Sequence, residues 1–309
     1  MANNRRLRRC GAILVVTLSF VFMAYVVADN WQQFKPYKEH FGLHYPLLLA
    51  AFLLYPSGLV PNTVAWHYIM LCLGGAPEFK TNARIYCYSC LPRRIPGGVW
   101  HIAGRAVMNR EQGIAHSQTL LGTFLEWLLL VLSGLLVYLG SLLLPAGRVM
   151  GGLGLKPGVA LALFVPLLVM LLPPVLNRFI RLVRPGTEDP TALRAADIFR
   201  LVAIFVLAWI MGGIILYLVL LALSPVPLSA LPAVVGAWAG AGAAGFVAAY
   251  VLQGLGVHEA TLSLLLSSVI PLPIAIVASV LMRILLTVGD LFWPLLWLRF
   301  LPKSTGSSQ

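Results

Sequence analysis

Residues 120–144 read LLGTFLEWLLLVLSGLLVYLGSLLL, an apolar run with one charged side chain, Glu126, near its start. A run of this length is typical of a transmembrane helix, because about 20 residues cross the hydrocarbon core. Upstream, residues 95–105 read IPGGVWHIAGR, in which a Pro-Gly-Gly turn precedes a Trp-His pair and Arg105. Since a charge in hydrocarbon is costly unless it is paired or reaches water, we interpret this window as the candidate site.

The composition of the whole chain is that of a membrane protein. Of the 309 residues, 60% are hydrophobic and 10% are charged, whereas soluble domains carry about 25% charged residues. Apolar runs recur along the chain, and no segment between them is long enough to bury a core of its own. The prediction is one all-α integral membrane domain, a polytopic helical bundle over residues 1–309, with a disordered tail at 302–309.

The net charge of +12 is explained by the membrane. The arginines cluster in the loops of one face, as the positive-inside rule predicts for the cytoplasmic side, and anionic lipid headgroups are their natural counter-charge. There is no basic domain and no aromatic platform, so no nucleic-acid partner is expected. Arg5, Arg6, Arg8 and Arg9 precede an apolar run at residues 11–28, which predicts a retained first helix in the plasma (inner) membrane with a cytoplasmic N-terminus.

We expect about eight membrane helices, with seven plus a re-entrant segment as the alternative. Residues 55–62, with Pro56 and Pro61, form either a kink or an unwound turn that lines a cavity. Residues 78–118 form a polar cytoplasmic segment, of which 95–102 are apolar enough to dip into the bilayer. Glycines at 236, 240, 242 and 245 predict close approach of a neighbouring helix.

The chain is predicted to have two halves, residues 11–177 and 198–301, with a glycine-rich break at a corresponding position in each. Pro96-Gly97-Gly98 is followed by His101, and Gly254-Leu255-Gly256 by His258. Both breaks are expected at the cytoplasmic face, which would make the halves a parallel two-fold repeat of the kind that transporters use. A chance match between glycine-rich turns is the alternative.

The breaks favour binding of an anion. Glycine lets backbone amides approach a ligand, and a helix N-terminus after such a turn suits phosphate. Arg105 could add a bidentate contact, and Trp100 would lie at headgroup depth. The two histidines could shuttle protons, with ordinary packing as the alternative.

The remaining charged residues in apolar segments are expected to form pairs. Glu126 is a functional candidate or half of a salt bridge, and Glu259 could pair with Arg283 or with Arg105. A structural pair between Arg283 and Asp290 is also expected.

The sequence contains no known catalytic signature. There is no GxSxG, P-loop or HExxH motif, so the chain is not expected to be an enzyme, although a membrane-embedded transferase with Glu126 or Glu259 as base stays open. Cys87 and Cys90 form a lone CxxC in an expected loop, too few ligands for zinc. No cofactor and no metal are predicted.

These motifs resemble the lysylphosphatidylglycerol synthase transmembrane region family. The resemblance covers about residues 11–301 and is carried by IPGGVWHIAGR, Gln112-Gly113-Ile114, the run around Glu126, and GLGVHEATL at 254–262 with Arg283 downstream. In the second motif, Gln253 stands where the family usually has proline and His258 where it has arginine.

The resemblance implies a domain that moves a lipid, or a lipid-linked headgroup, between leaflets. Its partners would be membrane lipids, namely an anionic phospholipid or a polyprenyl-phosphate-linked lipid. The full synthases continue into an aminoacyl-transferase domain. We expect no such domain in residues 1–309, so lipid synthesis is not expected from them. The implied substrate-binding residues are Pro96, Gly97, Gly98, Trp100, His101, Arg105, Glu126, Gly256, Glu259 and Arg283, with Gly104 beside them.

In a second hypothesis the protein does not transport lipid. The chain would then be a membrane partner of a glycosyl- or aminoacyl-transferase, with the basic segment 178–200 as its docking face. A homo-oligomer is possible, and one that is active alone would count against this second hypothesis.

Overall fold

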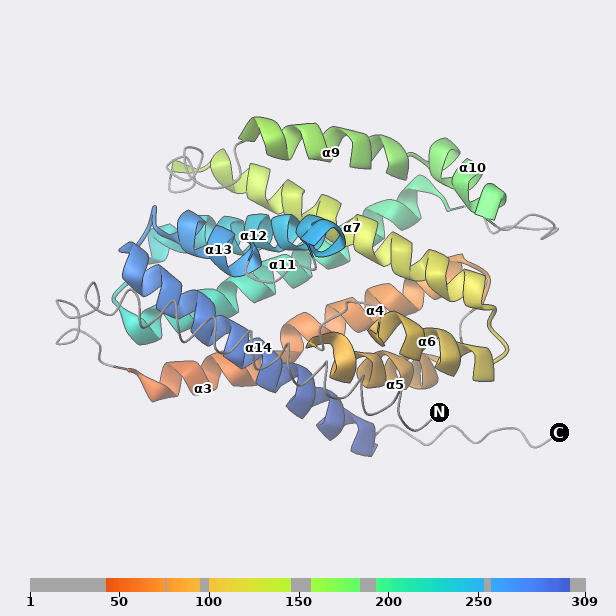
Figure 1. Cartoon of the computed structure of the whole chain (residues 1–309), viewed down its shortest axis with the longest axis horizontal. Helices are drawn as coiled ribbons and strands as arrows, with labels where there is room; N and C mark the ends of the chain where they lie inside the picture. The colour runs from red at the N-terminus through yellow and green to blue at the C-terminus, as the bar shows by residue number, and fades with distance from the viewer. Residues whose placement is uncertain are drawn as a thin grey trace.

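The computed structural model describes residues 43–75, 77–94, 100–145, 157–183, 193–252 and 257–300. Within these ranges 88% of the residues are helical and no strand occurs, which confirms the all-α class. In Figure 1 most of the long helices lie side by side, with their axes roughly along the long dimension of the molecule. The helices are α3 (Tyr45–Leu54), α4 (Pro56–Cys72), α5 (Phe79–Cys90), η2 (Leu91–Arg94), α6 (Trp100–Glu111), α7 (His116–Leu142), α9 (Pro157–Leu171), α10 (Pro173–Val183), α11 (Ala195–Leu223), η4 (Leu228–Ala230), α12 (Leu231–Leu252), α13 (Val257–Leu266) and α14 (Leu272–Phe300).

Five helical segments of the described chain are long and apolar enough to cross a membrane. They are Tyr45–Cys72, His116–Leu142, Ala195–Leu223, Leu228–Val247 and Leu272–Phe300. A sixth forms if α9 and α10, bent by 69° at their junction, count as one broken span. The chain is therefore a polytopic helical membrane protein. The predicted helix at 11–28 lies outside the described residues, so the total of eight stays a prediction.

The proline-rich break in the first described span is a kink. Tyr55 between α3 and α4 keeps right-handed helical angles, with φ −50° and ψ −41°, and its N–H donates to the carbonyl of Phe52. The Ser57 hydroxyl donates to the carbonyl of Leu54 at 2.7 Å. Because side chain and backbone both cap the interrupted turn, no unwound segment is needed here.

The small residues of α12 form its packing surface, as predicted. A Cβ on Gly240 would lie 2.7 Å from the ring of Tyr138 on α7, and one on Gly242 would overlap Trp209 of α11. A Cβ on Gly245 would lie 3.0 Å from His258 of α13. Glycine at these positions lets three helices approach the α12 backbone, and dispersion contacts replace the hydrophobic drive that lipid cannot supply.

Side-chain contacts define two ends of the bundle. At the first end α4 terminates beside the starts of α7 and α11: Gln118 donates to the carbonyl of Leu73 at 2.7 Å, and Tyr68 donates to Asp197 at 2.6 Å. At the second end α3 begins where α11 terminates, because the N–H of His44 donates to the carbonyl of Ala222 at 3.1 Å.

Two helix pairs enter the bundle and return to the end that they came from. The chain leaves α4 at the first end and begins α7 at the same end, so α5 and α6 between them make no net crossing. It leaves α11 at the second end and begins α14 there, so α12 and α13 make none either (Figure 1). The two pairs thus enter from opposite ends. The breaks themselves, residues 95–99 and 253–256, lie outside the described residues, so the expectation that both open at one face stays a prediction.

The α5 helix was not anticipated from the sequence. Its polar composition predicts a cytoplasmic segment, yet Asn82, Tyr86, Cys87, Ser89 and Cys90 are all buried. The re-entrant element therefore begins near residue 79, well before the predicted dip at 95–102. Helix α5 can be polar and buried because its side chains find partners on α4, α6 and α7.

Candidate functional site

The centre of the first re-entrant pair is an ion pair between α6 and α7. Arg105 on α6 donates to Glu126 on α7, and the two side chains are 1% and 8% exposed. Glycine at 113, with φ +79°, forms the turn that folds α6 back along α7. The predicted functional residues Arg105 and Glu126 thus neutralise each other inside the bundle, as two charges in an apolar interior must.

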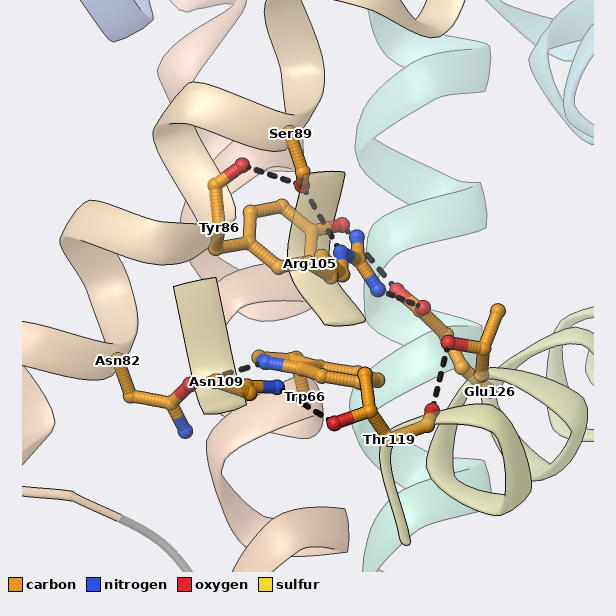
Figure 2. A network of polar contacts seen from close by, with 9 residues as sticks. Trp66, Asn82, Tyr86, Ser89, Arg105, Asn109, Thr119 and Glu126 are labelled. Carbon is orange, nitrogen blue, oxygen red and sulfur yellow. Dashed lines mark hydrogen bonds and ion pairs between the residues drawn. The ribbon is translucent and has the colours of Figure 1, made fainter. Parts of the chain in front are cut away.

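Aromatic rings and hydroxyl groups enclose this ion pair (Figure 2). The guanidinium carbon of Arg105 lies 4.3 Å from the ring centroid of Trp66 and 4.4 Å from that of Tyr86. Its Nε donates to the Ser89 hydroxyl at 2.8 Å, and the Tyr86 hydroxyl donates to Glu126 at 3.3 Å. Two cation–π faces and two charged hydrogen bonds hold the guanidinium in one position.

The polar network continues on both sides of the ion pair. One turn along α6, Asn109 donates to the Thr119 hydroxyl of α7 at 3.1 Å. On the other side, Trp66 donates to Asn82 at 3.0 Å, and Asn82 lies 3.1 Å from Nδ1 of His67. These residues join α4, α5, α6 and α7 into one unit, and nothing in the local sequence pattern marks Trp66, Asn82 or Tyr86 as members.

The second re-entrant pair leads to a matching ion pair. Glu259 on α13 accepts a hydrogen bond from Arg283 on α14. One turn along α13, the hydroxyl groups of Ser263 and Ser279 lie 2.9 Å apart. As contacts move forward along α13 they move backward along α14, so the two helices run antiparallel. Helices α6 and α7 do the same, since Arg105–Glu126 is followed by Asn109–Thr119.

The second pair is more open than the first. Arg283 is 27% exposed and Glu259 16%. One carboxylate oxygen of Glu259, Oε2, is buried and has no hydrogen-bond partner among the described residues. Nδ1 of His258 lies 3.9 Å from the same carboxylate. Glu259 therefore has two basic side chains beside it and is less enclosed than Glu126.

Both ion pairs lie near the middle of the bundle. Glu126 is ten residues past the start of α7 at the first end, and Arg283 is eleven past the start of α14 at the second. At a rise of about 1.5 Å per residue each lies about 15 Å in, half of a hydrocarbon core about 30 Å thick. The two pairs approach the same depth from opposite ends.

The other predicted site residues lie at the start of α6 or outside the described chain. Trp100 is 37% exposed, and His101 follows it in the first turn. No atom lies within 4 Å of the position that a Cβ on Gly104 would take. Pro96, Gly97, Gly98 and Gly256 lie outside the described residues, so the predicted meeting of the two breaks in one pocket stays a prediction.

Two expected pairings are settled by the geometry. Of the alternatives for Glu259, Arg283 is the partner, while Arg105 belongs to Glu126. Asp290, expected to pair with Arg283, accepts a hydrogen bond from Tyr55 instead. The sequence could not give this, because Tyr55 lies 235 residues away.

The CxxC cysteines are buried in α5, not placed in a loop as predicted. Cys87 and Cys90 are both 0% exposed. Buried thiols of this kind are unreactive, which disfavours redox chemistry. Within the described residues, no group of three or more His, Cys, Asp or Glu side chains could hold a metal ion.

The chain matches no protein-family model and no curated protein.

Proposed function

We propose that this protein is a lipid translocator of the membrane, and that its substrate carries an anionic, phosphate-bearing headgroup. The single observation that carries the proposal is the pair of re-entrant elements that enter from opposite ends, each with an Arg–Glu pair about halfway through. Transporters place their substrate sites near the bilayer midplane, at discontinuous helices from related halves.

The electrostatics favour an anion. Helices α6 and α13 both begin at their inner ends, so their free N–H groups and positive dipole ends are directed toward the interior. Arg283 is partly accessible and is held by one carboxylate. A phosphate oxygen can replace or bridge that carboxylate, because guanidinium groups bind both in the same fork geometry.

The lipid nature of the substrate rests on the sequence resemblance to the lysylphosphatidylglycerol synthase transmembrane region family. The same resemblance favours an anionic phospholipid or a polyprenyl-phosphate-linked lipid. We place the protein in the plasma (inner) membrane with its N-terminus in the cytoplasm, on the strength of the positive-inside pattern.

A flipping experiment with a matched control tests the proposal. Purified protein is reconstituted into vesicles that contain fluorescently labelled phosphatidylglycerol or phosphatidylcholine, and transfer is read by quenching of the outer leaflet. Transfer of the anionic lipid should exceed that of the zwitterionic one. Arg283→Gln should lower the anionic rate at least tenfold, whereas Arg299→Gln, an exposed arginine at the end of the same helix, should leave it unchanged.

Two results would count against the proposal. Equal rates for Arg283→Gln and the parent protein would remove this site. Folded protein that moves neither lipid, but co-purifies with a glycosyl- or aminoacyl-transferase, would favour the partner-subunit hypothesis.

A further inference from the structure

Helix α10 lies near the first end of the bundle and differs from the long helices in its direction. It follows the apolar helix α9 after a bend of 69°. Leu176 and Ile180 are 1% and 2% exposed and fix it to the core. The side-chain amide of Asn177 both donates to and accepts from the backbone of Leu193, at 3.1 and 3.0 Å, just before α11. The helix is therefore held in a set orientation across the end of the bundle.

The outward face of α10 is divided into a basic and an apolar flank. Arg178 and Arg181 are exposed and, three residues apart, lie on neighbouring positions of the helix surface. Val175 and Leu182, 42% and 74% exposed, are separated by two turns and share the adjacent flank. A helix with buried, basic and apolar sides is typical of one that lies in the membrane interface.

Two further exposed arginines, Arg194 and Arg200, lie in the first turns of α11, which Asn177 joins to α10 through Leu193. Arg200 lies 3.8 Å from Asp197 and donates to the Tyr68 hydroxyl at 3.0 Å, but its side chain is 65% exposed. We call Val175, Arg178, Arg181, Leu182, Arg194 and Arg200 the α10 platform.

We propose that the α10 platform binds the anionic lipid surface of one leaflet, with its arginines at the headgroups and Val175 and Leu182 in the acyl region. The occupant follows from charge complementarity and from the continuity of α10 with the membrane helix α9. An acidic protein would match the arginines, but it would leave the apolar flank, which adjoins the bilayer, unused. The platform lies at the end of the bundle. Its binding to the lipid surface does not require that the protein translocates lipid.

The test places a fluorescent reporter on the apolar flank of the full-length chain. Leu182→Cys is introduced with Cys10→Ser and Cys72→Ser, while Cys87 and Cys90 stay because they are buried. The labelled protein is reconstituted into vesicles of phosphatidylcholine alone or with phosphatidylglycerol. We expect a blue-shifted emission and quenching by shallow lipid-attached nitroxides, both stronger with phosphatidylglycerol and weakened by high salt.

Arginine variants then link the reporter to the basic flank. The ratio of buried to exposed probe should fall about fivefold for each of Arg178→Gln and Arg181→Gln, the factor for one basic residue near an anionic surface. Lys80→Gln and Arg110→Gln, made singly, each remove one charge from an exposed position of α5 or α6 and should change the ratio little. The salt titration of the parent protein tests the proposal even if a variant misfolds.

Three results would overturn the proposal. The first is an emission that stays typical of a water-exposed probe in every vesicle. The second is an emission that does not change with salt concentration or with the charge of the lipid. Loss of a co-purifying acidic protein in the arginine variants, without any lipid effect, would assign the surface to a protein partner instead.

Discussion

The α6–α7 and α13–α14 hairpins share the same arrangement of polar pairs, but their ion pairs differ in exposure. In each, a short helix returns from a glycine-rich break and bonds a long helix through an Arg–Glu pair and, one turn on, a neutral polar pair. The first ion pair is closed between Trp66 and Tyr86, whereas the second keeps a partly exposed arginine and an unpartnered carboxylate oxygen. A buried ion pair holds helices together, while an accessible one can exchange partners.

The largest contrast should come from removing each arginine. Arg105→Ala leaves the buried Glu126 without its charge partner and should lower the free energy of unfolding by about 3–5 kcal/mol. Arg283→Ala should lower it by at most about 2 kcal/mol, because the Glu259 carboxylate left behind is less enclosed in the bundle than Glu126. Thermal unfolding of the purified variants in detergent measures both.

The reverse order of these losses would contradict the comparison. Arg105→Met with Glu126→Leu is the control, because an apolar pair of similar volume should recover much of the stability that the single variant loses.

Close packing against α12 should give the next effect. Gly242→Ala places a methyl group on Trp209 and should cost about 1–3 kcal/mol, since the ring is held by hydrogen bonds to α7. The same thermal measurement applies, and Gly140→Ala, where no atom lies within 4 Å of the added Cβ, is the matched control. A normal melting temperature for Gly242→Ala would show that α11 can move away from α12.

The neutral contacts of the two hairpins should differ in the same direction as the ion pairs. Thr119→Val leaves the fully buried Asn109 amide without its acceptor and should cost about 1–3 kcal/mol. Ser279→Ala should cost about 0.5–1.5 kcal/mol, because Ser263 also donates to the carbonyl of Glu259. Denaturation of both variants under identical conditions decides the order, and equal losses would mean that the two hairpins are equally closed.

The smallest effect is expected at Gly104. It lies inside α6 with open space around it, so Gly104→Ala should raise stability by up to about 1 kcal/mol through helix propensity. If transport also stays intact, Gly104 is not a binding residue. A loss of transport without a loss of stability would show instead that the space beside Gly104 is needed by the substrate.

Much of the fold was predictable because it depends on local properties. Apolar length alone indicates the membrane class, and the run at residues 120–144 marks the span His116–Leu142 at nearly its final bounds. The cost of charge in hydrocarbon singled out Arg105, Glu126, Glu259 and Arg283, and all four lie in ion pairs. The glycines of α12 indicated close packing for the same reason, since a missing side chain is a property of the sequence itself.

Other features depend on contacts between distant segments. Helix α5 is too polar to be recognised as buried, because its partners Trp66 and Arg105 belong to other helices. The choice of Glu126 over Glu259 as partner of Arg105 requires the path of the whole chain. The end from which each re-entrant pair enters also requires the path of the whole chain, because the hydropathy of a segment does not show from which side it enters the membrane. The sequence by itself determined a helical membrane protein with costly charges; only tertiary packing decided which charges are enclosed and which stay partly exposed, because that depends on contacts between distant helices.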